Sequence, residues 1–106
     1  MAKKQKKSRQ RLKKKEQERK TVNLLRQGTQ ALHNGEITKA VQLLERSHHL
    51  DPKNPDVALN LGLIYRDRQE KDEALHWFRQ AVEANPNDRD AKHFIEQLSQ
   101  DNEETS

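Results

Sequence analysis

Histidines and one serine are the side chains whose chemistry could support catalysis or metal binding in this chain. His48 and His49 are adjacent, and adjacent side chains on a helix point about 100° apart. They therefore cannot share a metal ion as an i, i+4 pair can. Ser47 diverges from His48 in the same way, so the two do not form a nucleophile and its base. The five histidines are interpreted as surface residues: His33, His48, His49, His76 and His93.

Other signatures of chemistry are missing from the sequence. The chain has no cysteine, which excludes disulfides, thiolate zinc sites and cysteine nucleophiles. It contains no phosphate loop, no dinucleotide fingerprint and no paired catalytic carboxylates. Trp77 beside Phe78 is expected to be a packing residue. We therefore predict a protein that is not an enzyme and has no catalytic residue, no cofactor and no metal site.

Charge is distributed very unevenly along the 106 residues. Residues 1–20 hold 11 lysines and arginines against Glu16 and Glu18, a net charge of +9. Because the whole chain carries +4, residues 21–106 carry −5. We call residues 1–20 the basic arm. Such an arm on a mildly acidic body indicates an anionic partner.

The composition of the basic arm narrows the choice of partner. After Met1 its only apolar residues are Ala2 and Leu12, too few for an amphipathic membrane helix. It has no aromatic residue to stack on bases, so it would bind phosphates without reading sequence. RNA, including ribosomal RNA, DNA and an anionic membrane surface are candidate partners, and a solvated tail is the alternative. The candidate residues are Lys3, Lys4, Lys6, Lys7, Arg9, Arg11, Lys13, Lys14 and Lys15.

The hydrophobic content of the chain bears on where the protein is located. Apolar residues make up 30% of the chain, and no apolar run approaches the ~20 residues of a membrane span. No hydrophobic segment follows the basic N-terminus, as a secretory signal would require. These features predict a soluble, cytoplasmic protein, with nuclear import as an alternative in a eukaryote.

A repeat with a fixed period organises the rest of the chain. The repeated residues are Gly28 and Gly62, Ala40 and Ala74, and Pro52 and Pro86, and each pair has the same separation. A fixed period of about 20–50 residues is typical of stacked supersecondary units. We expect one unit at 21–54 and a second at 55–88, each a helix, a turn and a second helix. A glycine inside a helix in both units indicates a close helix–helix crossing.

Local signals predict where the helices begin and end. In the second unit, Asn54 and Pro55 suit the N-cap and first turn of a helix over 55–68, and the next helix covers 71–84. In the first unit, Asn34 and Gly35 form the turn. Asp88 is the expected N-cap of a capping helix at 89–100, before an acidic disordered tail at 101–106. Because residues 8–20 are good helix formers, the first helix could extend back into the basic arm.

The pattern resembles the tetratricopeptide repeat family. The second unit matches at Leu61, Gly62, Tyr65, Ala74, Phe78, Ala81 and Pro86. The first matches at Leu24, Gly28, Ala40, Leu44 and Pro52. It departs at Gln27, Ala31 and Ser47, which indicates looser packing. The resemblance implies an all-α solenoid of two repeats plus a capping helix, with a protein or peptide partner in a concave groove.

The resemblance also implies which side chains line that groove. The set is Leu25, Arg26, Thr29, His33, Leu59, Asn60, Leu63 and Arg66. Exposed Leu59 and Leu63 would offer an apolar contact, unless they pack under the capping helix or a neighbouring chain. The lysines of the carboxylate clamp in chaperone-binding members are missing, and only Asn60 matches. We therefore predict a protein-interaction scaffold. The alternatives are a nucleic-acid- or ribosome-associated protein acting through the basic arm, and a homo-oligomer.

Overall fold

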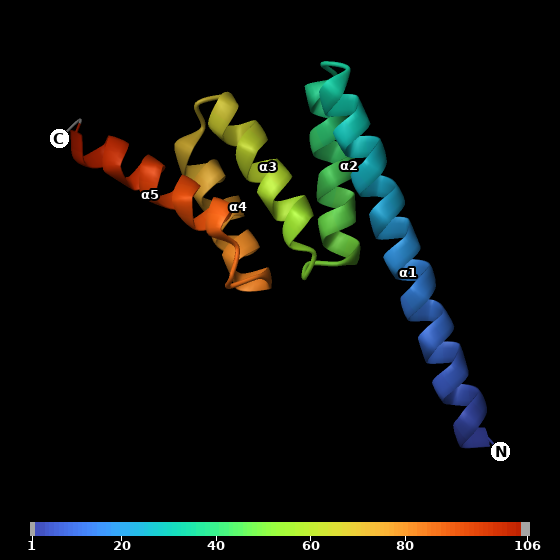
Figure 1. The fold of residues 1–106 in the computed structure, drawn as a ribbon. Helices are drawn as coiled ribbons and strands as arrows, with labels where there is room; N and C mark the ends of the chain where they lie inside the picture. Colours follow the sequence, from blue (N-terminus) through green and yellow to red (C-terminus); the bar gives the residue numbers. More distant parts are fainter. Residues whose placement is uncertain (1, 105–106) are drawn as a thin grey trace.

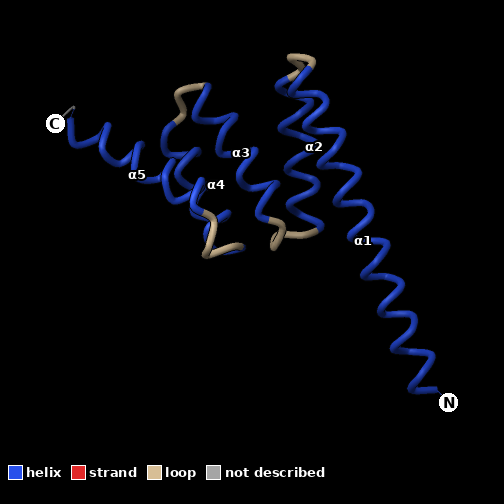
Figure 2. Tube along the Cα trace, viewed as in Figure 1, coloured by secondary structure: helices blue, strands red, loops and turns tan. Residues whose placement is uncertain are grey.

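Five helices make up the part of the chain that the computed structural model describes, which is the backbone of residues 2–104 and the side chains of residues 9–100 (Figure 1). They are α1 (Ala2–His33), α2 (Ile37–Leu50), α3 (Pro55–Asp67), α4 (Lys71–Ala84) and α5 (Arg89–Glu104). Short loops connect them, and residues 2–104 contain no strand (Figure 2). The predicted all-α architecture is confirmed.

Polar caps set the start of two helices. The Asn54 side chain accepts a hydrogen bond from the Asp56 amide at 3.0 Å, with Pro55 in the first turn of α3. The Asp88 carboxylate accepts one from the Ala91 amide at 3.1 Å at the start of α5. These caps satisfy amides that have no partner within their helix. Both predicted N-caps are therefore present.

Each pair of helices packs through a glycine. A β-carbon built on Gly62 would lie 2.5 Å from ring atoms of Phe78, and one built on Gly28 would lie 2.9 Å from Leu44. The backbones of α1 and α2, and of α3 and α4, therefore approach more closely than a side chain would allow. The predicted close crossings are confirmed in both units.

The core runs between the two helix pairs. Leu44 of α2 and Val57, Leu61 and Ile64 of α3 belong to one buried cluster. A second, smaller cluster joins Ala58, Ala81 and Ala91, and so ties α5 to the second unit. Burial of these faces supplies most of the stability, because helices of 13–16 residues are marginal alone.

The departures from the family pattern in the first unit have separate physical causes. Ser47 is fully buried, and its hydroxyl donates a hydrogen bond to the Thr21 carbonyl at 2.9 Å across the α1–α2 contact. Ala31 is buried in the main cluster. Gln27 is exposed, whereas its counterpart Leu61 is buried, because α2 covers α3 but no helix covers the corresponding side of α1 among residues 2–104.

The first helix extends into the basic arm, as the sequence suggested, and the last helix is longer than expected. The helix α1 continues through the basic arm to Ala2 and projects beyond the other helices (Figure 1). The helix α5 continues to Glu104, so the expectation of a disordered tail from residue 101 is wrong for residues 101–104. Residues 105–106 lie outside the described part of the chain. In the basic arm, good helix formers without proline or glycine explain the extension of α1.

Candidate interaction surface

The predicted groove residues lie on the less buried sides of α1 and α3. On α3, Val57 and Leu61 are buried, while Leu59 and Leu63 on the other side are half-buried. On α1, Gly28 and Ala31 are buried against α2. The remaining predicted residues of α1 vary in exposure: Leu25 and Thr29 are half-buried, and Arg26 and His33 are exposed.

The two groove leucines differ in what surrounds them. Leu59 packs against the cluster of Ala58, Ala81 and Ala91, so α5 and α4 cover part of its side chain. Leu63 is also half-buried. Both leucines are therefore neither fully exposed nor fully buried, and the apolar contact site at these positions stays a prediction. The part of each leucine that stays exposed adds to the apolar surface of α3, with Arg66 one turn further along the helix from Leu63.

Arg66 lies next to these leucines and is held in place by a stack of two aromatic rings. Its guanidinium lies over the Phe94 ring at 4.8 Å, and Phe94 stacks on Phe78 with the ring centroids 5.0 Å apart. The guanidinium also contacts the Asp67 carboxylate at 3.3 Å. A guanidinium over an aromatic face is attracted by the ring's negative potential. Arg66 is therefore positioned by α5 rather than extended into solvent.

Two predicted polar groove residues bond to their own helix. The Asn60 amide donates to the Asp56 carbonyl at 2.9 Å, and the Thr29 hydroxyl donates to the Arg26 carbonyl at 2.9 Å. In both cases the side-chain oxygen can still accept a hydrogen bond. Asn60 therefore retains an acceptor for the backbone amide of an extended partner.

The described part of the basic arm presents its charges to solvent on a helix. Arg9, Arg11 and Lys13–Lys15 are all exposed. The arm is held against α2 at one point, where the Gln17 side-chain amide donates to the Leu50 carbonyl. The side chains of Lys3, Lys4, Lys6 and Lys7 lie outside the described residues. The arm also carries Leu12, with 60% of its surface exposed.

An aromatic cluster that the sequence did not reveal lies between α2 and α4. Trp77 meets His48 edge-on at 4.9 Å on one side and His76 at 5.1 Å on the other. His48 is half-buried, so its interpretation as a surface residue is wrong. Burial lowers the pKa of His48, and nearby His76 lowers it further. Trp77 is a packing residue, as predicted.

Two buried nitrogens of this cluster, His48 Nδ1 and Trp77 Nε1, have no hydrogen-bond partner among residues 9–100. The repeat could have indicated where this cluster lies. Trp77 occupies the position that Leu43 holds in the first unit, and it packs against the preceding unit. Among the described residues, no group of three or more histidine, aspartate and glutamate side chains is placed to hold a metal ion.

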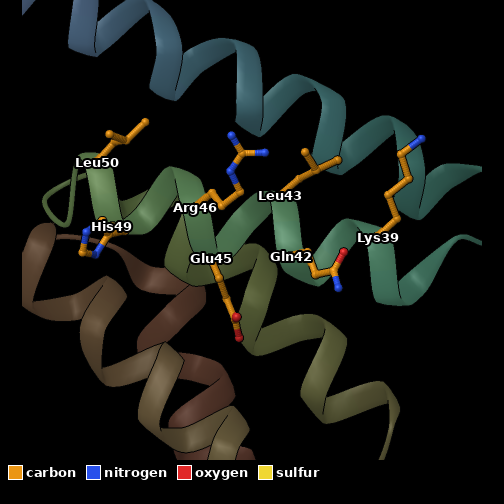
Figure 3. A pocket seen from close by; sticks show the side chains of 7 residues that line it. All are labelled: Lys39, Gln42, Leu43, Glu45, Arg46, His49 and Leu50. Carbon is orange, nitrogen blue, oxygen red and sulfur yellow. The ribbon is translucent and has the colours of Figure 1, made fainter.

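A hollow of about 760 Å³ lies on α2 rather than in the predicted groove. Figure 3 shows Leu43, Arg46 and Leu50 extending from one side of α2 and Glu45 from the other. All the residues that line it come from this single helix. A depression between the side chains of one helix has no opposing wall to enclose a ligand. We therefore do not assign it as a binding site.

Comparison with known proteins gives one match. The model of the family described as tetratricopeptide repeat matches residues 31–98, which spans α2, α3, α4 and most of α5. A comparison with curated proteins found no significant match. Within the described residues, none of the helices combines the length and hydropathy that a membrane span requires.

Proposed function

Because the chain belongs to the tetratricopeptide repeat family, we propose that it is a non-enzymatic scaffold that binds a protein or peptide along α1, α3 and α5. The observation that carries this proposal is the half-buried state of Leu59 and Leu63, which leaves part of each apolar side chain exposed on the side of α3 away from Val57 and Leu61. Apolar contacts at these leucines would supply affinity. Asn60 and the basic groups Arg26 and Arg66 would orient the bound segment.

We propose the same unit boundaries that the repeat predicts. The first unit is 21–54, the second is 55–88, and the helix from Arg89 is the cap. The basic arm is a separate functional element in front of the first unit, and we propose that it contacts an anionic partner.

Photocrosslinking at Leu63 tests the groove. We expect a photoreactive residue at position 63 to capture a protein or peptide partner in cells. The same residue at Glu83, an exposed position on α4, is the matched control and should capture little. Equal capture at both positions would contradict the groove. A product with the mass of two copies of this chain would identify self-association, and light scattering of the purified protein would check it.

A second candidate function is binding of RNA or DNA through the basic arm. The exposure of Arg9, Arg11 and Lys13–Lys15 on a helix supports it. Binding to phosphates releases counterions, so affinity should fall steeply with salt. Changing these five residues to glutamine should abolish retention of a labelled RNA strand and flatten the salt dependence. Retention that survives the five changes would exclude this function of the arm.

A further inference from the structure

We propose that the groove extends along α1 onto the basic arm, and that the extension binds an acidic amphipathic helix of the protein partner. The surface in question, which we call the α1 stripe, consists of Leu12, Lys15, Arg19, Val22 and Arg26. The inference rests on the proposed function, because the stripe leads directly into the groove residues of the same helix.

The spacing of these residues places them on one side of α1. They are separated by three, four, three and four residues, which is the spacing of neighbours on a helical face. The same alternation continues to Thr29 and His33, two predicted groove residues. A single continuous face therefore runs from the projecting part of α1 into the groove.

Two contacts with α2 fix the direction of this face. Gln17 donates to the Leu50 carbonyl, and Ser47 donates to the Thr21 carbonyl at 2.9 Å. Thr21, like Gly28 further along, is buried on the side of α1 that packs on α2. With about 100° between successive residues, the α1 stripe lies on the opposite side of the helix. The extension is therefore presented to a partner and not to the rest of this chain.

The apolar members of the stripe need an explanation. Leu12 and Val22 expose 60% and 57% of their surface and are the large apolar side chains most exposed among residues 9–100. Basic residues separate them, and Glu18 and Asn23 lie beside Lys15, Arg19 and Val22 along the same helix. No ion pair between the side chains of residues 9–100 engages Lys15, Arg19 or Arg26.

This mixture favours a protein partner over a nucleic acid. A phosphate backbone gains nothing from Leu12 or Val22, the two apolar side chains of the stripe. A partner helix with apolar and acidic residues at matching spacing would cover Leu12 and Val22. Its carboxylates would pair with the basic side chains of the stripe. Arginine suits such pairs because its guanidinium can bond a carboxylate through two parallel hydrogen bonds.

The test uses the full chain and peptides selected from a random 16-residue display library. We expect the enriched peptides to combine acidic and apolar residues at helical spacing. In fluorescence anisotropy, the variant K15Q/R19Q should bind them about tenfold more weakly, which corresponds to about 1.4 kcal/mol. The matched control K13Q/K20Q removes the same charge from outside the stripe, and we expect a change of less than about twofold with it.

Several results would overturn the inference. They are a selection without enrichment, enriched peptides without acidic residues, and equal losses in the two variants. Tighter binding of an RNA strand or a DNA duplex, with the larger loss in K15Q/R19Q, would assign the stripe to nucleic acid instead. The variant L63D separates this inference from the proposed groove. If L63D abolishes peptide binding while K15Q/R19Q does not, the proposed groove is supported and its extension is contradicted. If K15Q/R19Q abolishes peptide binding while L63D does not, the groove at Leu63 is contradicted and the α1 stripe is retained.

Discussion

At the two helix crossings, the neighbours of each glycine decide whether a larger residue is tolerated there. Gly62 and Gly28 occupy equivalent places in the two units, but their neighbours differ. The β-carbon of an alanine at 62 would meet the ring of Phe78, which is fully buried and stacked on Phe94. At 28 it would meet the γ-carbon and one methyl group of Leu44, an aliphatic side chain that is also fully buried. A ring held from both sides cannot move away as easily as an aliphatic side chain.

We therefore predict opposite tolerance at the two glycines. Alanine gains about 1 kcal/mol in helix propensity at either site, and overpacking costs about 1–3 kcal/mol. G62A should lower the free energy of unfolding by up to about 2 kcal/mol once the gain is subtracted. G28A should leave it nearly unchanged. Urea denaturation of both variants checks this, and equal effects would show that Phe78 adapts as readily as Leu44.

Acidic pH should destabilise the fold through His48. Burial, then the neighbouring His76 and, to a smaller degree, His49 lower its pKa below the ordinary 6.5, against an opposing effect of Asp51. The unfolded chain then binds a proton at His48 more readily than the folded protein does. This contribution to stability is complete above about pH 6.5 and is lost as pH falls toward the folded-state pKa.

The variant H48F tests this assignment. It keeps an aromatic edge against Trp77 and removes a buried nitrogen that lacks a hydrogen-bond partner within the described side chains. We expect its free energy of unfolding to depend less on pH between 7 and 5 than that of the original protein. H49Q is the control, because His49 is exposed, and it should retain the pH dependence. An unchanged pH profile in H48F would assign the effect to other groups.

At the scale of elements, the two helix-turn-helix units share one turn geometry with different residues. Gly35 has φ of 81° in the turn between α1 and α2, and Gln69, at the equivalent place in the second unit, has φ of 62°. Left-handed backbone costs a residue with a side chain about 1–2 kcal/mol. The second unit therefore carries a strained turn that the first unit avoids.

Exchanging the two turn residues should expose this strain. We predict that G35Q lowers the free energy of unfolding by about 1 kcal/mol. Q69G should raise it by about 0.5 kcal/mol, since glycine also adds entropy to the unfolded chain. Chemical denaturation of the single variants measures both changes. A loss of stability in Q69G would mean that the glutamine side chain makes contacts that outweigh the strain.

At the scale of the whole molecule, the projecting part of α1 controls the shape. The radius of gyration is 16.7 Å and the extents are 65 × 30 × 17 Å. A compact chain of this length would have a radius of gyration of about 13 Å. At 1.5 Å per residue, α1 alone is about 48 Å long. The basic arm therefore continues α1 as a helical extension of the first unit.

Removing residues 1–16 should reverse this elongation. The truncated chain keeps Gln17, and with it the contact to the Leu50 carbonyl. We expect small-angle scattering to give a radius of gyration of about 12 Å, the value for a compact chain of the remaining length. Circular dichroism should lose helical signal for the residues removed. If neither quantity changes, the arm is not a helical extension in solution.

Local patterns in the sequence determined the helices, the repeat period and the segregation of charge. Caps such as Asn54 and Asp88 act within one turn of the chain, and the glycine, alanine and proline pairs report a spacing, so none of these needs a distant partner to be seen. Only the tertiary structure decided what covers each side chain. Leu59 is partly covered because α4 and α5 pack beside it, and His48 is half-buried against Trp77 of α4. The α1 stripe faces away from the body because α2 takes the opposite side of α1. Exposure depends on contacts between residues far apart in the chain, and a short window of sequence does not contain them.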